Sequence, residues 1–323
     1  MARKQKKRRK VKSVGKARTK RIRRQQVHVV MPSAEEMNAS YNQGYNHGFD
    51  KGHDAGYEKG RYDGGDGIVD QLMPDAMVLP GIPIEQIIAK GLEGLQHEFV
   101  KVMATDETVR HIVHALDHRQ PFSLVRLGDG ELLTMSQDIL KSREELERYR
   151  SFLEYAGVTI PNLEARDQLV SSVKAASLTG IPLLRVPNYQ NLAFEVFRAY
   201  GIDYRQKKLT HSTINYAVYL EHRLPDLLNG RRVLTVGNKA VGLAEVFAAA
   251  GLSVAGAISP VMGMAEIPRG MEEAARMQFD IAIISAGIPS VVIAQRMADE
   301  LGKVAIDFGH LADSMVSGES PYR

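Results

Sequence analysis

The 323-residue sequence contains no cysteine and no tryptophan. Without cysteine the chain has no disulfide framework, no thiolate metal site and no cysteine nucleophile, which fits a reducing compartment. Its most apolar stretch, residues 281–294, is broken by Gly287 and Pro289 and is shorter than the about 20 residues of a membrane-spanning helix. The N-terminus is basic and lacks the apolar segment of a secretory signal. We therefore expect a cytoplasmic protein, or one that is peripheral to an anionic surface.

Charge is divided unevenly along the chain. The sequence has 42 Lys and Arg against 38 Asp and Glu, a net charge of +4. Fourteen of the basic residues lie within residues 1–24 and the first acidic residue is Glu35, so the remainder carries a net charge of −10. Residues 1–40 are expected to form a basic, disordered tail, because so polar a segment cannot bury a core. The tail suits a polyanion such as nucleic acid or an anionic surface, and the alternative is a solubilising tail without a dedicated partner.

Glycine recurs at every fourth position from Gly44 to Gly64, and aromatic residues such as Tyr41, Tyr45 and Phe49 open several of these tetrapeptides. A helix with this period has a glycine stripe that gives a partner helix close access. A flexible tether is equally compatible with the repeat, because each glycine inside a helix costs about 1 kcal/mol relative to alanine. We assign residues 41–67 as a helical spacer or a tether, and residues 41–64 as a candidate homo-oligomerisation element.

Residues 79–323 alternate between short apolar runs and helical segments, as is typical of an α/β domain. An amphipathic helical stripe is expected within residues 84–103. Strands are expected at residues 122–127, 182–186, 232–236, 253–258, 280–285 and 303–308. Helices are expected at residues 163–178, 190–200, 213–223, 239–250, 271–277 and 289–301. This alternation predicts a Rossmann-like, mainly parallel sheet with helices on both faces.

In such sheets ligands bind beyond the carboxyl ends of the strands, so the loop after the first apolar run is a candidate site. It contains Arg126, Gly128, Asp129 and Glu131. The two carboxylates are hard oxygen ligands that suit Mg²⁺ or Mn²⁺, and Arg126 is a candidate for a bidentate phosphate contact. The alternative is an ordinary Gly-Asp-Gly turn in which Glu131 caps the following helix.

Two further loops carry suitable residues. Gly237, Asn238 and Gly242 form a glycine loop at the start of a helix, where backbone N–H groups favour a phosphate or a nucleotide. Tight packing of the strand and the helix explains these glycines equally well. Asp307 lies at the end of the last apolar run and His310 follows it, and a histidine on a glycine pivot near a carboxylate is a candidate base.

Two of these segments together resemble a known family. The segment SLVRLGDGEL resembles the R-x-G-D-G-E signature of the bacterial GT-D-type glycosyltransferases, and residues 280–310 resemble that family's closing pattern, which ends Asp-x-Gly-His. The resemblance runs from about residue 107 to residue 313. It implies a nucleotide-sugar-dependent transferase with a Rossmann-like, GT-D-like sheet. It also implies a divalent metal and a UDP-sugar at Asp129 and Glu131, and less directly at Arg126 and Gly128.

We therefore predict a metal-dependent glycosyltransferase that moves a sugar from a nucleoside-diphosphate sugar to a hydroxyl of a glycan, a protein or a surface polymer. In this hypothesis Mn²⁺ or Mg²⁺ at Asp129 and Glu131 stabilises the departing diphosphate, and His310 with Asp307 contacts or deprotonates the acceptor. One alternative is a catalytically inactive nucleotide-binding or scaffold protein that its basic tail tethers to a polyanion. Another is a Rossmann-type enzyme that uses a different cofactor.

Overall fold

The computed structural model describes residues 33–185 and 187–323. The basic residues 1–24, and with them the predicted polyanion site, lie outside the described part of the chain. The chain divides into two units with a boundary between His97 and Glu98. Residues 79–97, which the sequence analysis assigned to the α/β domain, therefore belong to the first unit.

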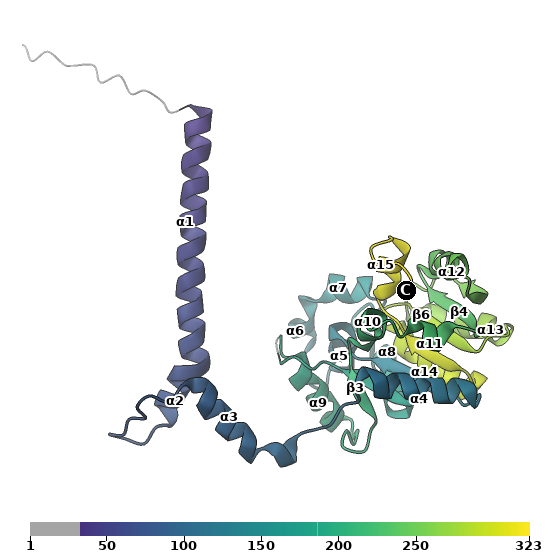
Figure 1. The fold of residues 1–323 in the computed structure, drawn as a ribbon, viewed down its shortest axis with the longest axis horizontal. Coiled ribbons are helices and arrows are strands. Elements are labelled where there is room, and N and C mark those ends of the chain that lie inside the picture. The colour runs from purple at the N-terminus through teal and green to yellow at the C-terminus, as the bar shows by residue number, and fades with distance from the viewer. Residues whose placement is uncertain (1–32, 186) are drawn as a thin grey trace, which may run out of the picture. The chain divides into compact units, whose positions relative to one another are not determined.

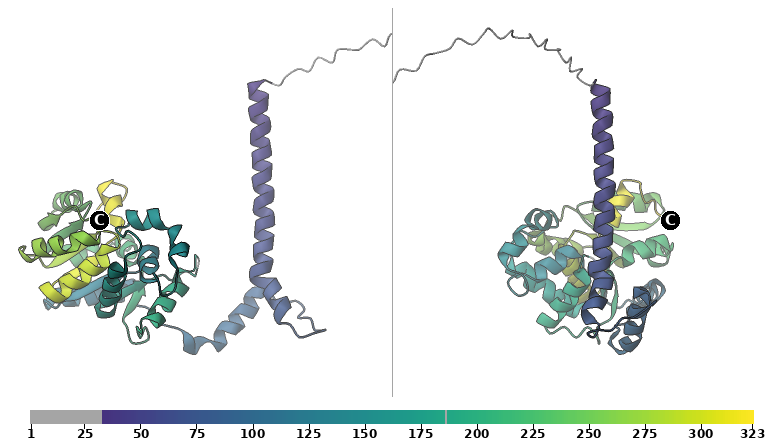
Figure 2. Two further views of the ribbon diagram at one scale, coloured as in Figure 1. Left: turned by 180° about the vertical axis from the view of Figure 1, so that it is seen from behind. Right: turned by 90° about the vertical axis from the view of Figure 1, so that its left-hand side faces the viewer.

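The first unit contains the glycine repeat, and the structure makes this repeat helical. Helix α1 spans Ala34–Arg61, so it begins within the predicted tail; a π-helical turn at Tyr62–Asp66 joins it to α2, Gly67–Leu72 (Figure 1). Helix α3, Ile84–Gly94, and a 3₁₀ turn at Gln96–Glu98 follow. Within this unit, α2 and α3 lie at the C-terminal end of α1 (Figure 2). Every side chain of α1 whose exposure is described is exposed.

The second unit is built on a sheet in which every strand pairing is parallel. The strand order is β3-β2-β1-β7-β6-β4-β5. The strands are β1 (Phe122–Arg126), β2 (Leu178–Ile181), β3 (Leu209–His211), β4 (Arg232–Gly237), β5 (Ser253–Ile258), β6 (Ile281–Ser285) and β7 (Val304–Asp307). The predicted α/β class and parallel sheet are therefore confirmed.

Helices cover both faces of this sheet, as its continuous apolar strands require. Alternate residues of β1 show the division, since Leu124 joins one buried cluster and Val125 joins the other. One face is covered by α4 (Thr105–Asp117), α10 (Ile214–Leu220), α11 (Leu224–Leu228), α12 (Ala240–Ala249) and α15 (Leu311–Val316). The other is covered by α5 (Asp129–Met135), α6 (Arg143–Glu147), α7 (Arg150–Tyr155), α8 (Leu163–Ala175), α9 (Tyr189–Ala199), α13 (Ile267–Ala275) and α14 (Pro289–Leu301).

Two strand assignments from the sequence are wrong. The strand expected at residues 182–186 lies earlier, in β2, because Pro182 has no N–H to donate to a sheet ladder and begins the loop instead. The short strand β3 was missed, since Leu209 is the only strongly apolar residue in it. Among the described residues, no helix is both long and apolar enough to cross a bilayer.

Candidate functional site

The topology brings the candidate residues to one edge of the sheet. From β1 the chain proceeds outward through β2 to β3 and then crosses to β4, while β7 returns to pair with β1. The order of strands therefore reverses between β1 and β7, and such a switch point is the usual place for a ligand in an open α/β sheet. Arg126 ends β1 and Asp307 ends β7, so both stand at this point.

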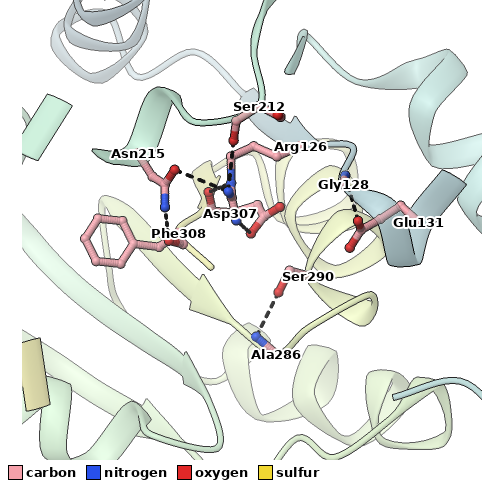
Figure 3. Close-up of polar contacts among 9 residues, drawn as sticks. All are labelled: Arg126, Gly128, Glu131, Ser212, Asn215, Ala286, Ser290, Asp307 and Phe308. Atoms are coloured by element: carbon pink, nitrogen blue, oxygen red, sulfur yellow. Dashed lines mark hydrogen bonds and ion pairs between the residues drawn. The ribbon is translucent and has the colours of Figure 1, made fainter. Parts of the chain in front are cut away.

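Arg126 connects three segments at the switch point (Figure 3). Its Nε donates to the backbone oxygen of Asp307 and its Nη2 to Asp307 Oδ1, both at 2.9 Å. Its Nη1 donates to the backbone oxygen of Ser212 at 3.0 Å and to Asn215 Oδ1 at 3.2 Å. Four of its five N–H groups therefore have protein acceptors. A bidentate phosphate contact would require some of these bonds to be given up, and the phosphate role stays a prediction.

Asn215 completes this network, and the sequence analysis did not identify it. Its side chain is buried, with 3% of its surface exposed, and its Nδ2 donates to the backbone oxygen of Phe308 at 2.8 Å (Figure 3). Asn215 thus holds both Arg126 and the loop that follows β7. Asn215 lies in α10, and the sequence around it contains no motif. The one signal of its role is a buried side-chain amide, because such a group needs hydrogen-bond partners.

Asp307 and Gly309 are fixed by the same arginine. Burial raises the pKa of the Asp307 carboxyl, and the ion pair with Arg126 opposes that shift. This carboxylate is buried and bonded to Arg126, and its catalytic role stays a prediction. Gly309 has a φ of +57°, and a Cβ at this position would lie 2.0 Å from Arg126 Nη2. Only glycine therefore leaves room for the guanidinium.

The two carboxylates of the Asp-x-Glu segment lie in the first turn of α5. Glu131 Oε2 accepts a hydrogen bond from the N–H of Gly128 at 2.8 Å (Figure 3), which is the helix-capping contact that the sequence analysis gave as an alternative. Asp129 is exposed, and its Oδ1 accepts from the N–H of Gly130 at 2.9 Å. Within the described residues, Asp129 Oδ2 accepts no hydrogen bond.

These carboxylates also have different electrostatic surroundings. Burial, and secondly the negative charge of Asp307, raise the pKa of Glu131 to about 7. Asp129 instead lies near Tyr189, whose pKa is raised first by burial and then by the Asp129 charge. The charges that act on Glu131 are therefore those of Asp307 and Arg126, whereas Asp129 lies near Tyr189 at the start of α9.

The donor set suits a divalent cation of the hard type. Mg²⁺ in particular is commonly bound by one or two carboxylates together with substrate phosphates. Asp129 is exposed and has one oxygen without a hydrogen bond in the described chain. Burial and, secondly, the charge of Asp307 disfavour the ionised form of Glu131, and a bound cation would favour that form. Asp129 and Glu131 are therefore the residues that fit such an ion.

The glycine loop after β4 is explained by close packing. Gly237 has a φ of +135°, and a Cβ there would lie 2.0 Å from the backbone oxygen of Ser285. A Cβ on Gly242 would lie 2.9 Å from Val316 Cγ1, so this glycine allows α12 to approach α15. Asn238 Oδ1 accepts a hydrogen bond from the N–H of Val261 at 3.0 Å. The predicted nucleotide contacts of this loop stay predictions.

The remaining loops at this edge complete the candidate site. His310 is exposed and immediately precedes α15, directly after the Gly309 turn that Arg126 fixes. After β6, the N–H of Ala286 donates to Ser290 Oγ at 2.8 Å, which closes the turn into α14 (Figure 3). The structure thus places Arg126, Asp129, Glu131, Gly237, Asp307 and His310 at the carboxyl edge of one sheet.

Comparison with known proteins assigns the second unit to a family. The family model described as the GT-D fold-like domain matches residues 103–315, about two thirds of the chain. Similar solved structures include a glycosyltransferase (domain of unknown function 1792) from Streptococcus sanguinis, with 15% identity, 68% of this chain and 86% of that chain covered, and a TM-score of 0.46. Another, described as domain of unknown function 1792 with a distinct glycosyltransferase fold, has 16% identity, 69% and 83% coverage, and a TM-score of 0.43. No curated protein matches the sequence.

Proposed function

The chain belongs to the GT-D-like family of glycosyltransferases, and from this premise we propose that it transfers a sugar from a nucleoside-diphosphate sugar, with UDP as the nucleotide. The acceptor in this proposal is a hydroxyl of a glycan, a protein or a surface polymer. The observation that carries the proposal is the position of the Gly128–Glu131 segment at the carboxyl end of β1, where the order of strands reverses beside β7.

Asp129 and Glu131 are the proposed ligands of Mn²⁺ or Mg²⁺, which when bound would neutralise charge on the departing diphosphate. Asp129 suits this role because it is exposed and has an oxygen free of hydrogen bonds in the described chain. Glu131 also holds the N–H of Gly128, so it would fix the start of α5 while it faces the ligand.

On the acceptor side, His310 is the proposed group that contacts or deprotonates the attacking hydroxyl. It is exposed, and its backbone position depends on the turn at Gly309. Arg126, Asp307 and Asn215 support this turn through the network at the end of β7. We assign them as positioning residues, because their polar groups are occupied by one another and by the backbone.

Donor hydrolysis in the presence of Mn²⁺ tests the proposal. Asp129→Ala and Glu131→Gln are each expected to lower turnover about 100-fold or more. The Glu131→Gln side chain keeps an oxygen that can accept from the N–H of Gly128, so its effect reports the lost charge and not a lost helix cap. Glu145→Gln is the matched control, because Glu145 Oε2 accepts from the N–H of Ser142 at 2.7 Å in the same capping geometry at α6.

Unchanged turnover in the double variant with Ala at 129 and 131 would refute the metal assignment. Donor binding without turnover across a panel of acceptors would instead indicate a nucleotide-binding protein that does not transfer sugar. Thermal unfolding with UDP-sugars, NAD or S-adenosylmethionine identifies the ligand class, since a bound ligand raises Tm by mass action. Stabilisation by NAD or S-adenosylmethionine alone would refute the donor assignment.

A further inference from the structure

Helix α1 is unusual because the described residues of its own unit give its glycine row no packing partner. Five glycines lie inside it, and each costs about 1 kcal/mol in helix stability relative to alanine. Helices in water gain most of their stability by burying one face. Yet every side chain of α1 whose exposure is described is exposed, and no described atom lies within 4 Å of a Cβ built on any of these glycines. Within its own unit, the helix therefore has a face that packs against nothing.

The residues of α1 form four rows, because the sequence repeats every four positions. The aromatic row holds Tyr41, Tyr45, Phe49, His53 and Tyr57, and the glycine row holds Gly44, Gly48, Gly52, Gly56 and Gly60. The acidic row contains Asp50, Asp54 and Glu58, and the basic row contains His47, Lys51 and Lys59. Successive residues are about 100° apart around the helix, so the rows follow one another in the order acidic, aromatic, glycine, basic. The aromatic and glycine rows are therefore adjacent.

The aromatic row is a ridge and the glycine row is a groove. Tyr41, Phe49 and Tyr57 are 63–70% exposed, and the rings of Tyr41 and Tyr45 stack along the helix with centroids 6.4 Å apart. Ridges and grooves along i±4 rows interdigitate when two helices cross at about −50°. We propose that α1 binds a second copy of itself, with the aromatic ridge of each copy in the glycine groove of the other.

The charged rows select a parallel arrangement. In a two-fold symmetric pair of parallel helices, each aromatic row faces the partner's glycine row, and each acidic row lies beside the partner's basic row. In an antiparallel pair the symmetry places like rows together, so that aromatic faces aromatic and acidic faces acidic. Within the described residues, no ion pair is found for Asp50, Lys51 or Glu58, so these charges are available to a partner. Ridge, groove and charge thus agree on one geometry.

Sedimentation equilibrium of the full-length protein tests the pairing. The wild type is expected to dimerise, and Gly48→Leu with Gly52→Leu is expected to weaken the dimer at least tenfold by filling the groove. Leucine is a better helix former than glycine, so circular dichroism should show that helix content is kept. The matched control is Gly91→Leu in α3, a helical glycine that also has nothing within 4 Å of a built Cβ but lies outside the four rows. A monomeric wild type, or a dimer that tolerates the two leucines, would overturn the proposal.

Two further measurements test, in turn, the parallel orientation and the pairing of the charged rows. The chain has no cysteine, so Met37→Cys gives one spin-label position, and the two labels are expected about 20 Å apart in a parallel pair and about 35 Å apart in an antiparallel one. In the second experiment, one variant carries Asp50→Lys, Asp54→Lys and Glu58→Lys, and another carries Lys51→Glu and Lys59→Glu. Each is expected to lose its own dimer, while their mixture forms a heterodimer. An antiparallel distance or the absence of that heterodimer would overturn the arrangement.

Discussion

The glycines of α1 and those of the α/β unit have opposite surroundings. In α1 a Cβ built on the repeat glycines meets nothing within 4 Å, whereas at Gly237 and Gly309 it would lie 2.0 Å from another atom. The α/β unit uses these glycines to bring backbone and side chains closer than any other residue permits. Within its own unit, α1 leaves the surface beside its glycines open. The same residue type therefore marks contact already made in one region and contact still available in the other.

The largest expected effect comes from Gly237→Ala. The added Cβ would collide with the backbone oxygen of Ser285, and the φ of +135° is one that alanine rarely adopts. We expect a loss of about 4 kcal/mol or more in the free energy of unfolding, measured in urea. Gly302→Ala is the control, since Gly302 has a positive φ of +65° but open space around it, and about 1 kcal/mol is expected there. Equal losses in the two variants would contradict the collision.

Gly309→Ala should act on the site more than on the fold. The new methyl group would displace the Arg126 guanidinium, which can swing away but then leaves the buried Asp307 unpaired. We expect turnover in the donor assay to fall about tenfold or more, because the turn before His310 loses its support. Gly302→Ala is the matched control, because Gly302 also has a positive φ, and this variant should keep full turnover. A fully active Gly309→Ala enzyme would refute the positioning role of Arg126.

Gly242→Ala should cost about 1–2 kcal/mol in the free energy of unfolding, as overpacking of a helix contact does. The added Cβ would lie 2.9 Å from Val316 Cγ1. Val316→Ala creates room for it, so the double variant should recover part of the lost stability. If the two changes simply add, then α12 and α15 do not meet at this pair.

Gly44→Ala and Gly60→Ala, at the two ends of the glycine row, should stabilise α1 and not destabilise it. Nothing lies near either position, so alanine only adds helix propensity, about 1 kcal/mol at each site. In protein diluted until the proposed dimer dissociates, hydrogen exchange of the α1 amide groups should therefore slow. Faster exchange would show that these glycines are already in contact with something.

The smallest effect concerns an ion pair. Arg232 donates to Asp280 through its side chain and backbone N–H, which lowers the pKa of Asp280 to about 2. The pKa of Asp280 in the folded protein is below its usual value near 4. The ion pair therefore stabilises the protein fully above about pH 4, and this stabilisation is lost as the pH falls toward 2. Asp280→Asn should lower Tm by about 1–3 °C at pH 7 and by less at pH 2.5. Asp63→Asn removes the exposed pair between Lys59 of α1 and Asp63 of the π-helical turn, and it should leave Tm unchanged at both pH values.

The sequence predicted most of the sheet, because strands such as Ile281–Ser285 are continuous apolar runs. It predicted poorly where local signals are weak, as in the three-residue strand Leu209–His211 and the loop that begins at Pro182. The segment with Asp129 was identifiable from its motif. Asn215 was not, because its partner Arg126 lies 89 positions away and such a hydrogen bond leaves no pattern in the sequence around either residue.

The pairing of β1 with β7 also bears on the order in which the protein is made. Arg126 and Asp307 are 181 positions apart, yet they form the centre of the candidate site. The ribosome synthesises β1 long before its neighbour β7. During most of translation, β1 therefore has an unpaired edge on the side that later pairs with β7. Domains with such distant pairings fold slowly and expose sticky strand edges meanwhile. The nascent chain should therefore depend on chaperones until its last strand emerges.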